Sequence, residues 1–193
     1  KIVDVTDWAK KTNFSIFKNA ECIRALKVKG DFSRKQIDKF TDIVKIYGAK
    51  GLAHLKKEND ELAGSIAKFV NESPFKLENG EHIFFVADIS RIVEPSLGAL
   101  RSHLGKELHL INEDEWKFVW ITEFPLMEWS EERQNWGPMH HPFTSPVLSD
   151  RHLLKTEPHK ASSRAYDLAL NGVELGGGSI RIHDRNLQEE VFD

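Results

Sequence analysis

The chain has 193 residues, of which 40% are hydrophobic and 30% are charged, and its formal net charge is -3. These values predict a globular protein with a filled core and give no basic excess of the kind that indicates nucleic-acid binding. The single cysteine, Cys22, excludes an internal disulfide and a cysteine-rich zinc site. We find no signal-peptide pattern and no apolar run of membrane-spanning length, so we expect a cytoplasmic protein with no membrane partner.

The two ends of the chain suggest a piece of a longer protein, and a processed protein is the alternative interpretation. It opens at Lys1 without an initiator methionine. It stops at Asp193, shortly after the start of a helix that we predict over 185–192 with Asp184 as its cap.

The first part of the chain predicts a compact α+β unit. Short apolar or alternating runs predict strands at 14–17, 22–28, 51–55 and 82–87. The polar segments 56–60 and 71–80 predict loops between these elements.

Two helices are predicted within this unit. Ser33 opens a Ser-Arg-Lys-Gln capping box, apolar residues follow at helical spacing, and Gly48 ends the pattern. The second helix has Asp88 or Ser90 as its cap, and Pro95 lies inside it unless the helix starts there. Basic residues on the first helix either contact RNA phosphate or form its solvated side.

The character of the chain changes near residues 112–115, a short acidic segment that we interpret as a domain boundary. Residues 117–123 have apolar side chains on both faces and predict a central strand, which Pro125 ends. The segment 137–146 holds three prolines and a glycine, so we expect a stiff loop rather than regular structure. One or two helical turns are predicted within 147–155.

Two adjacent histidines, His140 and His141, lie in this loop. They allow three interpretations, which are metal binding, acid and base catalysis, and hydrogen bonding to a small anionic ligand. Adjacent side chains point in different directions, so we do not expect both rings on one metal ion.

Residues 166–183 predict an antiparallel β-hairpin. Its centre is Asn171-Gly172, the strongest short signal for a type I′ turn, because both central residues of that turn need positive φ. The alternative interpretation is a surface hairpin with solvated charges.

The register that this turn sets places two carboxylates on one face. Ala169 faces Glu174, and Asp167 faces Gly176, so small partners leave this face open for a ligand or a metal ion. The opposite face is predicted to be a core face and carries Leu168, Leu170, Val173 and Leu175.

Three glycines, Gly176, Gly177 and Gly178, follow in the second strand of the hairpin. Glycines at this position indicate a bulge or a close approach to the backbone. Glu174 and Arg181 are seven residues apart, and an odd spacing in a regular strand puts side chains on opposite faces. We predict a bulge within the glycines that brings both side chains to one face.

Three segments of the second part carry a resemblance to a known family. They are Phe-Val-Trp-Ile-Thr-Glu-Phe-Pro at 118–125, His-His-Pro-Phe-Thr-Ser-Pro at 140–146, and the hairpin at 166–183. Together and in this order they resemble bacterial-type aspartyl-tRNA synthetase, a class II aminoacyl-tRNA synthetase. Residues 33–53 are similar to the GAD insertion domain of the same enzymes.

The resemblance implies an α+β fold in two parts. Residues 1–114 are expected to form a GAD-like insertion domain with a mixed or antiparallel sheet and helices, and residues 115–193 a partial class II catalytic domain with an antiparallel sheet. The implied activity is that of a ligase, which activates L-aspartate with Mg-ATP to aspartyl-adenylate and transfers the aspartyl group to tRNA. The family is homodimeric, and we expect no DNA partner.

The resemblance also implies residue roles. His140 and Arg181 match residues that contact aspartate, and the planar fork of arginine suits a carboxylate. Glu174 matches the acidic residue on the ATP side, and Asp167 its partner in holding Mg²⁺. His141 and the three glycines are expected to support the site, and no side chain is expected to act as a nucleophile.

Parts of the family pattern are missing. We find no N-terminal anticodon-binding barrel, no first class II motif for the dimer surface, no ATP-binding second motif, and no third motif of the Gly-x-Asp-Arg type. We therefore expect the chain alone to be inactive and its sheet edge to need a cover.

Two other functions are alternatives. One is a stand-alone RNA- or protein-binding module of the GAD type in residues 1–114. The other is a metal-dependent hydrolase that uses side chains of the second part, namely His140, His141, His183, Asp167 and Glu174.

Overall fold

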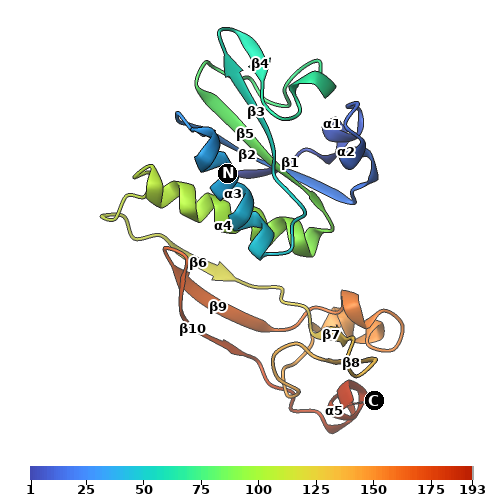
Figure 1. Cartoon of the computed structure of the whole chain (residues 1–193). Coiled ribbons are helices and arrows are strands. Elements are labelled where there is room, and N and C mark those ends of the chain that lie inside the picture. Colours follow the sequence, from blue (N-terminus) through green and yellow to red (C-terminus); the bar gives the residue numbers. More distant parts are fainter. Residues whose placement is uncertain (193) are drawn as a thin grey trace. The chain divides into compact units, whose positions relative to one another are not determined.

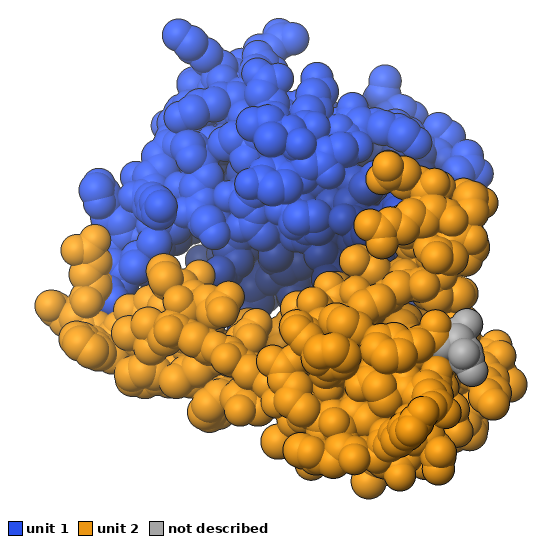
Figure 2. All heavy atoms as spheres, turned by 90° about the horizontal axis from the view of Figure 1, so that it is seen from below, with its two compact units in different colours: residues 1–112 blue, residues 113–193 orange. Residues whose placement is uncertain are grey.

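The computed structural model describes residues 1–192. The chain divides into two compact units, Lys1–Asn112 and Glu113–Asp193, called unit 1 and unit 2 below (Figure 1 and Figure 2). The boundary that we expected lies two residues further along the chain. Over residues 1–192, no helix is both long enough and apolar enough to cross a membrane.

Unit 1 is built on a five-stranded antiparallel sheet with the order β1-β2-β5-β3-β4 (Figure 1). β5 is the central strand because it pairs with both β2 and β3. The strands predicted at 22–28 and 82–87 are confirmed, whereas the one predicted at 51–55 starts two residues later. The five strands are β1 (Ile2–Asp4), β2 (Cys22–Lys29), β3 (Ala53–Glu58), β4 (Glu61–Ala63) and β5 (Glu81–Asp88).

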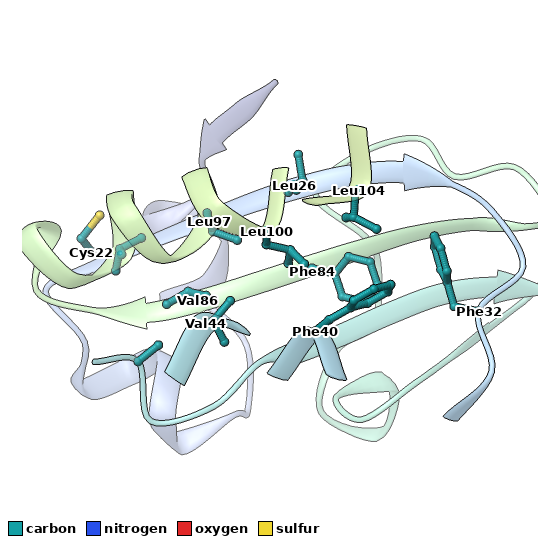
Figure 3. Close-up of a cluster of buried hydrophobic side chains, with 12 residues drawn as sticks. Cys22, Leu26, Phe32, Phe40, Val44, Phe84, Val86, Leu97, Leu100 and Leu104 are labelled. Atoms are coloured by element: carbon teal, nitrogen blue, oxygen red, sulfur yellow. The ribbon is translucent and has the colours of Figure 1, made fainter. Parts of the chain in front are cut away.

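Both faces of this sheet are buried. On one face Phe84 and Val86 of β5 pack against two long helices, α3 (Arg34–Ile46) and α4 (Ser90–Glu107), in the cluster of Figure 3. The alternate residues Ile83 and Phe85 face a second cluster on the other side. That side is covered by three short elements, α1 (Thr6–Lys10), α2 (Ser15–Asn19) and the 3-10 helix η1 (Ala67–Phe69).

The capping box predicted at Ser33 is present. The Ser33 hydroxyl accepts from the Gln36 backbone N–H at 3.3 Å, and the Ser33 N–H donates to the Gln36 side chain at 3.0 Å. The cap predicted for α4 is wrong, because Ile89 occupies that position and no side chain caps it. Pro95 lies inside α4, where its missing N–H removes one helical hydrogen bond.

Two local predictions in unit 1 are wrong. Residues predicted as a strand at 14–17 begin α2 instead, because Phe14 and Phe17 meet edge to face at 5.0 Å, a contact that helical spacing allows. The polar segment 56–60 is not a loop but the hairpin of β3 and β4. Asn59 and Asp60 form its turn with positive φ values of 51° and 65°.

Unit 2 holds a three-stranded antiparallel sheet with the order β10-β9-β6 and a separate hairpin of β7 and β8 (Figure 1). Its small core includes Leu126, Ala161 and Val191. The Asp184 cap is confirmed, since its carboxylate accepts from the Leu187 N–H at 2.7 Å. The elements are β6 (Phe118–Ile121), β7 (Met127–Ser130), β8 (Asn135–Pro138), η2 (Leu148–Leu153), η3 (Pro158–Lys160), β9 (Ala165–Leu170), β10 (Val173–Ser179) and α5 (Arg185–Phe192).

The apolar surface of the three-stranded sheet differs from two predictions. β6 is an edge strand rather than a central one, and Trp120 is 61% exposed. The expected core face of the hairpin is also open, with Val173 65% and Leu175 55% exposed. An alternating pattern identifies residues that suit a buried strand, but burial needs a further layer of structure. Within residues 113–192 no such layer covers these side chains.

Candidate functional site

The hairpin of β9 and β10 forms as the sequence predicts. Asn171 and Gly172 have φ values of 50° and 85°, as a type I′ turn requires. Next to the turn, Val173 pairs with Leu170 and Glu174 with Ala169.

Beyond Glu174 the pairing shifts by one residue. Leu175 is the extra residue of this bulge, so Gly176 pairs with Leu168 and Gly177 with Asp167. A bulge is therefore confirmed, but it lies one residue before the glycines. The predicted pairing of Asp167 with Gly176 is wrong for the same reason.

The bulge decides which side chains share a face. Paired residues of an antiparallel ladder project to the same side, and so do residues two apart in one strand. Glu174, opposite Ala169, is thus on the face of Asp167, and after the bulge so is Ser179, opposite Ala165. Arg181 lies two residues beyond Ser179, outside β10, where it pairs with Thr144. The register therefore puts Asp167 and Glu174 on one face, called the carboxylate face below, and the place of Arg181 beside them stays a prediction.

Two of the three glycines make room for side chains of β9. A Cβ atom on Gly177 would collide with the Asp167 carboxylate, and one on Gly178 would lie 3.0 Å from the Tyr166 hydroxyl. At Gly176 a Cβ would meet no atom within 4 Å. Gly177 and Gly178 therefore leave room for the side chains of Asp167 and Tyr166 on the neighbouring strand.

The histidine loop runs beside the segment that carries Arg181. The Ser145 N–H donates to the Ile180 carbonyl at 2.8 Å, the Ile182 N–H donates to the Phe143 carbonyl at 2.9 Å, and Thr144 forms a bridge with Arg181. These bonds tie the loop that follows the two histidines to the carboxylate face. Its first residues differ from the prediction, since positions 137 and 138 belong to β8.

The two histidine rings have different environments. The exposed His140 ring packs edge to face on Phe124 at 5.0 Å. His141 Nδ1 accepts from the Phe143 N–H at 3.1 Å, which holds the loop, and its ring lies 5.1 Å from that of Phe143. The structure therefore gives His141 a supporting contact and leaves the His140 ring nitrogens accessible.

Sequence reasoning missed two hydroxyl groups on the carboxylate face. Thr144 lies opposite Arg181, is 3% exposed, and has its hydroxyl 3.2 Å from that of Ser179. Ser179 pairs with Ala165 and so shares the face of Asp167. The sequence signal for this contact was Ser179, the hydroxyl residue directly after the three glycines. Only the pairing of segments that are distant in sequence shows that the Ser179 and Thr144 hydroxyls lie close together.

The charged groups of this face are open. Asp167, Glu174 and Arg181 form no ion pair with other residues in 1–192. In the same residues no group of three or more histidine, cysteine or acidic side chains is arranged to hold a metal ion. Mg²⁺ is commonly held by one or two carboxylates together with phosphate oxygens and water, and two carboxylates on one face fit that mode. The five-residue metal site of a hydrolase does not form.

Comparison with known proteins shows the family. The family model for tRNA synthetases class II (D, K and N) matches residues 3–193. The chain belongs to this family.

Individual relatives of this class II synthetase chain match along its whole length. Aspartate--tRNA(Asp/Asn) ligase of Bacillus cytotoxicus is 46% identical over 206 residues, and Aspartate--tRNA ligase of Clostridium botulinum strain Kyoto / Type A2 is 49% identical over 205 residues. Each match covers 100% of this chain and 35% of the relative. The chain thus spans about a third of the length of these relatives.

Proposed function

We propose that the chain is part of an aspartate-tRNA ligase, and that the carboxylate face of its hairpin supplies half of the site for L-aspartate and Mg-ATP. The supporting observation is the bulge at Leu175, which puts Ser179, two residues before Arg181, on the face of Asp167 and Glu174. The guanidinium group of Arg181 suits the carboxylate of an acidic amino acid. The carboxylates of Asp167 and Glu174 suit the metal ion of a metal-bound nucleotide. The names of the relatives support this substrate choice.

The residues divide into two groups of contacts. Arg181 binds the aspartate carboxylate through its guanidinium, and His140 donates a hydrogen bond to the same substrate. Asp167 and Glu174 hold Mg²⁺, with Glu174 on the ATP side. The metal ion, when bound, neutralises phosphate charge, while the protein side chains position the reactants and none acts as a nucleophile.

The two units have separate roles in this proposal. Unit 1 is an insertion domain of the GAD type, supported by its own sheet and core. Unit 2 is one part of the catalytic domain of a homodimeric, cytoplasmic enzyme that acts on tRNA. The proposal assigns only part of the aspartate and ATP contacts to this chain, so we expect no aminoacylation by the chain alone.

The first test is calorimetric titration of the chain with a non-hydrolysable aspartyl-adenylate analogue in the presence of Mg²⁺. We expect binding that Arg181→Ala abolishes. Binding that survives in this variant contradicts the assigned role of Arg181.

The second test uses the complete enzyme. Arg181→Lys keeps the charge but not the fork, so the KM for aspartate should rise about tenfold or more while the KM for ATP changes little. Equal increases in both KM values contradict the assignment. Asp167→Asn should shift the Mg²⁺ dependence of the rate, and an unchanged dependence would make Asp167 a structural residue.

A further inference from the structure

A pair of hydroxyl groups lies beside the segment of unit 2 that carries Arg181. Thr144 is 3% exposed, and its hydroxyl is 3.2 Å from that of Ser179, two residues before Arg181. Neither hydroxyl has a role in the function proposed above. A buried polar contact of this kind makes the structure around it rigid when its groups are paired. The contact between Thr144 and Ser179 therefore bears on the place of Arg181.

Thr144 and Arg181 face each other across a short antiparallel bridge. Two backbone hydrogen bonds of 2.8 and 2.9 Å flank this pair, one donated by the Ser145 N–H and the other by the Ile182 N–H. The pair itself exchanges no backbone hydrogen bond, and opposed side chains come closest in pairs of this type. They also project to the same side of the two segments.

The hydroxyl contact shows which side this is. Ser179 pairs with Ala165, two residues before Asp167, so its side chain lies on the carboxylate face. Thr144 reaches the Ser179 hydroxyl and therefore lies on that side as well. The residue opposite Thr144 is Arg181, and its side chain leaves the backbone in the same direction.

No charged partner holds the Arg181 side chain. It is exposed, and it forms no ion pair with the other residues of the described range, 1–192. A long side chain loses rotamer freedom when it binds a ligand, and this loss reduces the affinity. The protein can lower that cost by fixing the backbone from which the side chain leaves and the surface next to its first carbon atoms.

Threonine is well suited to provide this surface. Its Cβ atom carries two heavy atoms, so its χ1 angle has few allowed values. The contact at 3.2 Å favours the χ1 value that directs the Thr144 oxygen to Ser179. The side of Thr144 that faces Arg181 then has a defined shape.

We propose that Thr144 and Ser179 are positioning residues for Arg181, because their hydroxyl contact fixes the place from which the guanidinium reaches the substrate carboxylate. This inference rests on the function proposed for the hairpin. Thr144 and Ser179 themselves touch neither aspartate nor ATP. Their loss should weaken aspartate binding and spare the ATP side, since the pairing of β9 with β10 holds Asp167 and Glu174 in place.

The test is steady-state kinetics of the complete enzyme. Thr144→Val keeps the branched shape and removes the hydroxyl, so the KM for aspartate should rise about fivefold, while kcat and the KM for ATP change by less than about twofold. Ser179→Ala should have the same effect. The double variant should be no worse than either single variant, because both substitutions remove the same contact. Thr144→Ser restores the hydroxyl and should return the KM for aspartate to within about twofold of the unsubstituted enzyme.

Ser145→Ala is the matched control. Ser145 is next to Thr144 and is 4% exposed, but its hydroxyl donates to the Pro146 carbonyl at 3.0 Å. This variant also loses a buried hydroxyl, so thermal unfolding should show a similar loss of stability. Its KM for aspartate should be unchanged. A purely structural role of Thr144 would instead give Ser145→Ala and Thr144→Val the same kinetic effect.

A second cycle shows whether Thr144 acts through Arg181. Arg181→Lys removes the fork that Thr144 positions, so Thr144→Val in this background should change the KM for aspartate by less than about twofold.

Three outcomes overturn the inference and leave the proposed function intact. They are an unchanged KM for aspartate in Thr144→Val, equal increases in the two KM values, and a full effect of Thr144→Val on top of Arg181→Lys. If Arg181→Lys alone leaves the KM for aspartate unchanged, the proposed role of Arg181 fails and this inference fails with it. Ser179→Ala provides the same test if Thr144→Val does not fold.

Discussion

A buried pair of histidines makes the stability of unit 1 depend on pH. His54 on β3 and His82 on β5 are 7% and 3% exposed. His54 Nε2 and His82 Nδ1 lie 3.2 Å apart, and the rings are stacked with centroids 5.3 Å apart. One nitrogen of this contact donates and the other accepts, which requires that at least one ring is neutral.

The surroundings favour the neutral form of both rings. Burial lowers the pKa of His54 from 6.5 to about 4, and the neighbouring His82 and Lys56 act in the same direction. Burial and Lys56 also lower the pKa of His82, although the carboxylates of Asp31 and Glu58 oppose this shift.

The sign of the effect follows from linkage. Because the folded pKa of His54 lies below the unfolded value, the unfolded chain binds more protons in acid. The contribution of the neutral His54 ring to the free energy of unfolding is complete above pH 6.5 and is lost as the pH falls towards 4. A shift from 6.5 to about 4 corresponds to about 3 kcal/mol, or about 1.4 kcal/mol per pH unit within that window. At pH 5 we expect a loss of about 2 kcal/mol from His54.

The measurement is urea unfolding between pH 7.5 and 4.5, followed by the amide NMR signals of β2 and β5. His54→Gln keeps a hydrogen-bonding group but cannot titrate, so the variant should be less stable at pH 7.5 and should lose about 1.4 kcal/mol less per pH unit below 6.5. His109→Asn removes an exposed histidine of the same unit at a position with φ of 51°, which asparagine tolerates, and serves as control. If His54→Gln has the same pH dependence as the unsubstituted chain, the reasoning is refuted.

Three further predictions concern a cap, a glycine and an exposed ring. Ser33→Ala should reduce the free energy of unfolding by about 1 kcal/mol in urea titration, whereas Ser33→Asp should retain most of the cap; equal losses would contradict the capping role. Gly177→Ala should destabilise the hairpin by about 1 kcal/mol or more, because the new methyl group meets the Asp167 carboxylate. Gly176→Ala, which has open space, is the matched control, and an equal effect there would refute the steric argument. We expect the chain to self-associate through its apolar edge strand, where the Trp120 ring is 61% exposed, and Trp120→Glu should weaken that association in sedimentation experiments; unchanged association would exclude that surface.

Local chemistry made several elements of the fold predictable. Asn171-Gly172 set the hairpin turn because few other residue pairs accept two positive φ values. Ser33 and Gln36 set the start of α3 because each side chain accepts a hydrogen bond from the backbone N–H of the other residue. These two N–H groups have no hydrogen-bond partner within the helix. The carboxylate face was predictable for the same reason, since alternation from a fixed turn places Glu174 and Asp167 together.

Features that depend on contacts between distant residues were less predictable. The bulge was inferred from the spacing of Glu174 and Arg181. Its position at Leu175 depends on the pairing of Asp167 with Gly177, the residue that leaves room for the Asp167 carboxylate. The meeting of Thr144 with Ser179 depends on a loop that lies beside another segment, and no pattern within either segment announces it.

The sequence by itself determined the turn, the caps of α3 and α5 and the carboxylates that share one face, because each depends on the conformation of a few consecutive residues. The tertiary structure decided which apolar strands are buried, where the ladder slips and which polar groups meet. β5 and β6 are both apolar on two faces, yet β5 is central and buried whereas β6 is an exposed edge. Burial of a strand depends on the elements that pack against it. An apolar pattern therefore shows that a strand is suited to burial, and the surrounding packing determines whether it is buried.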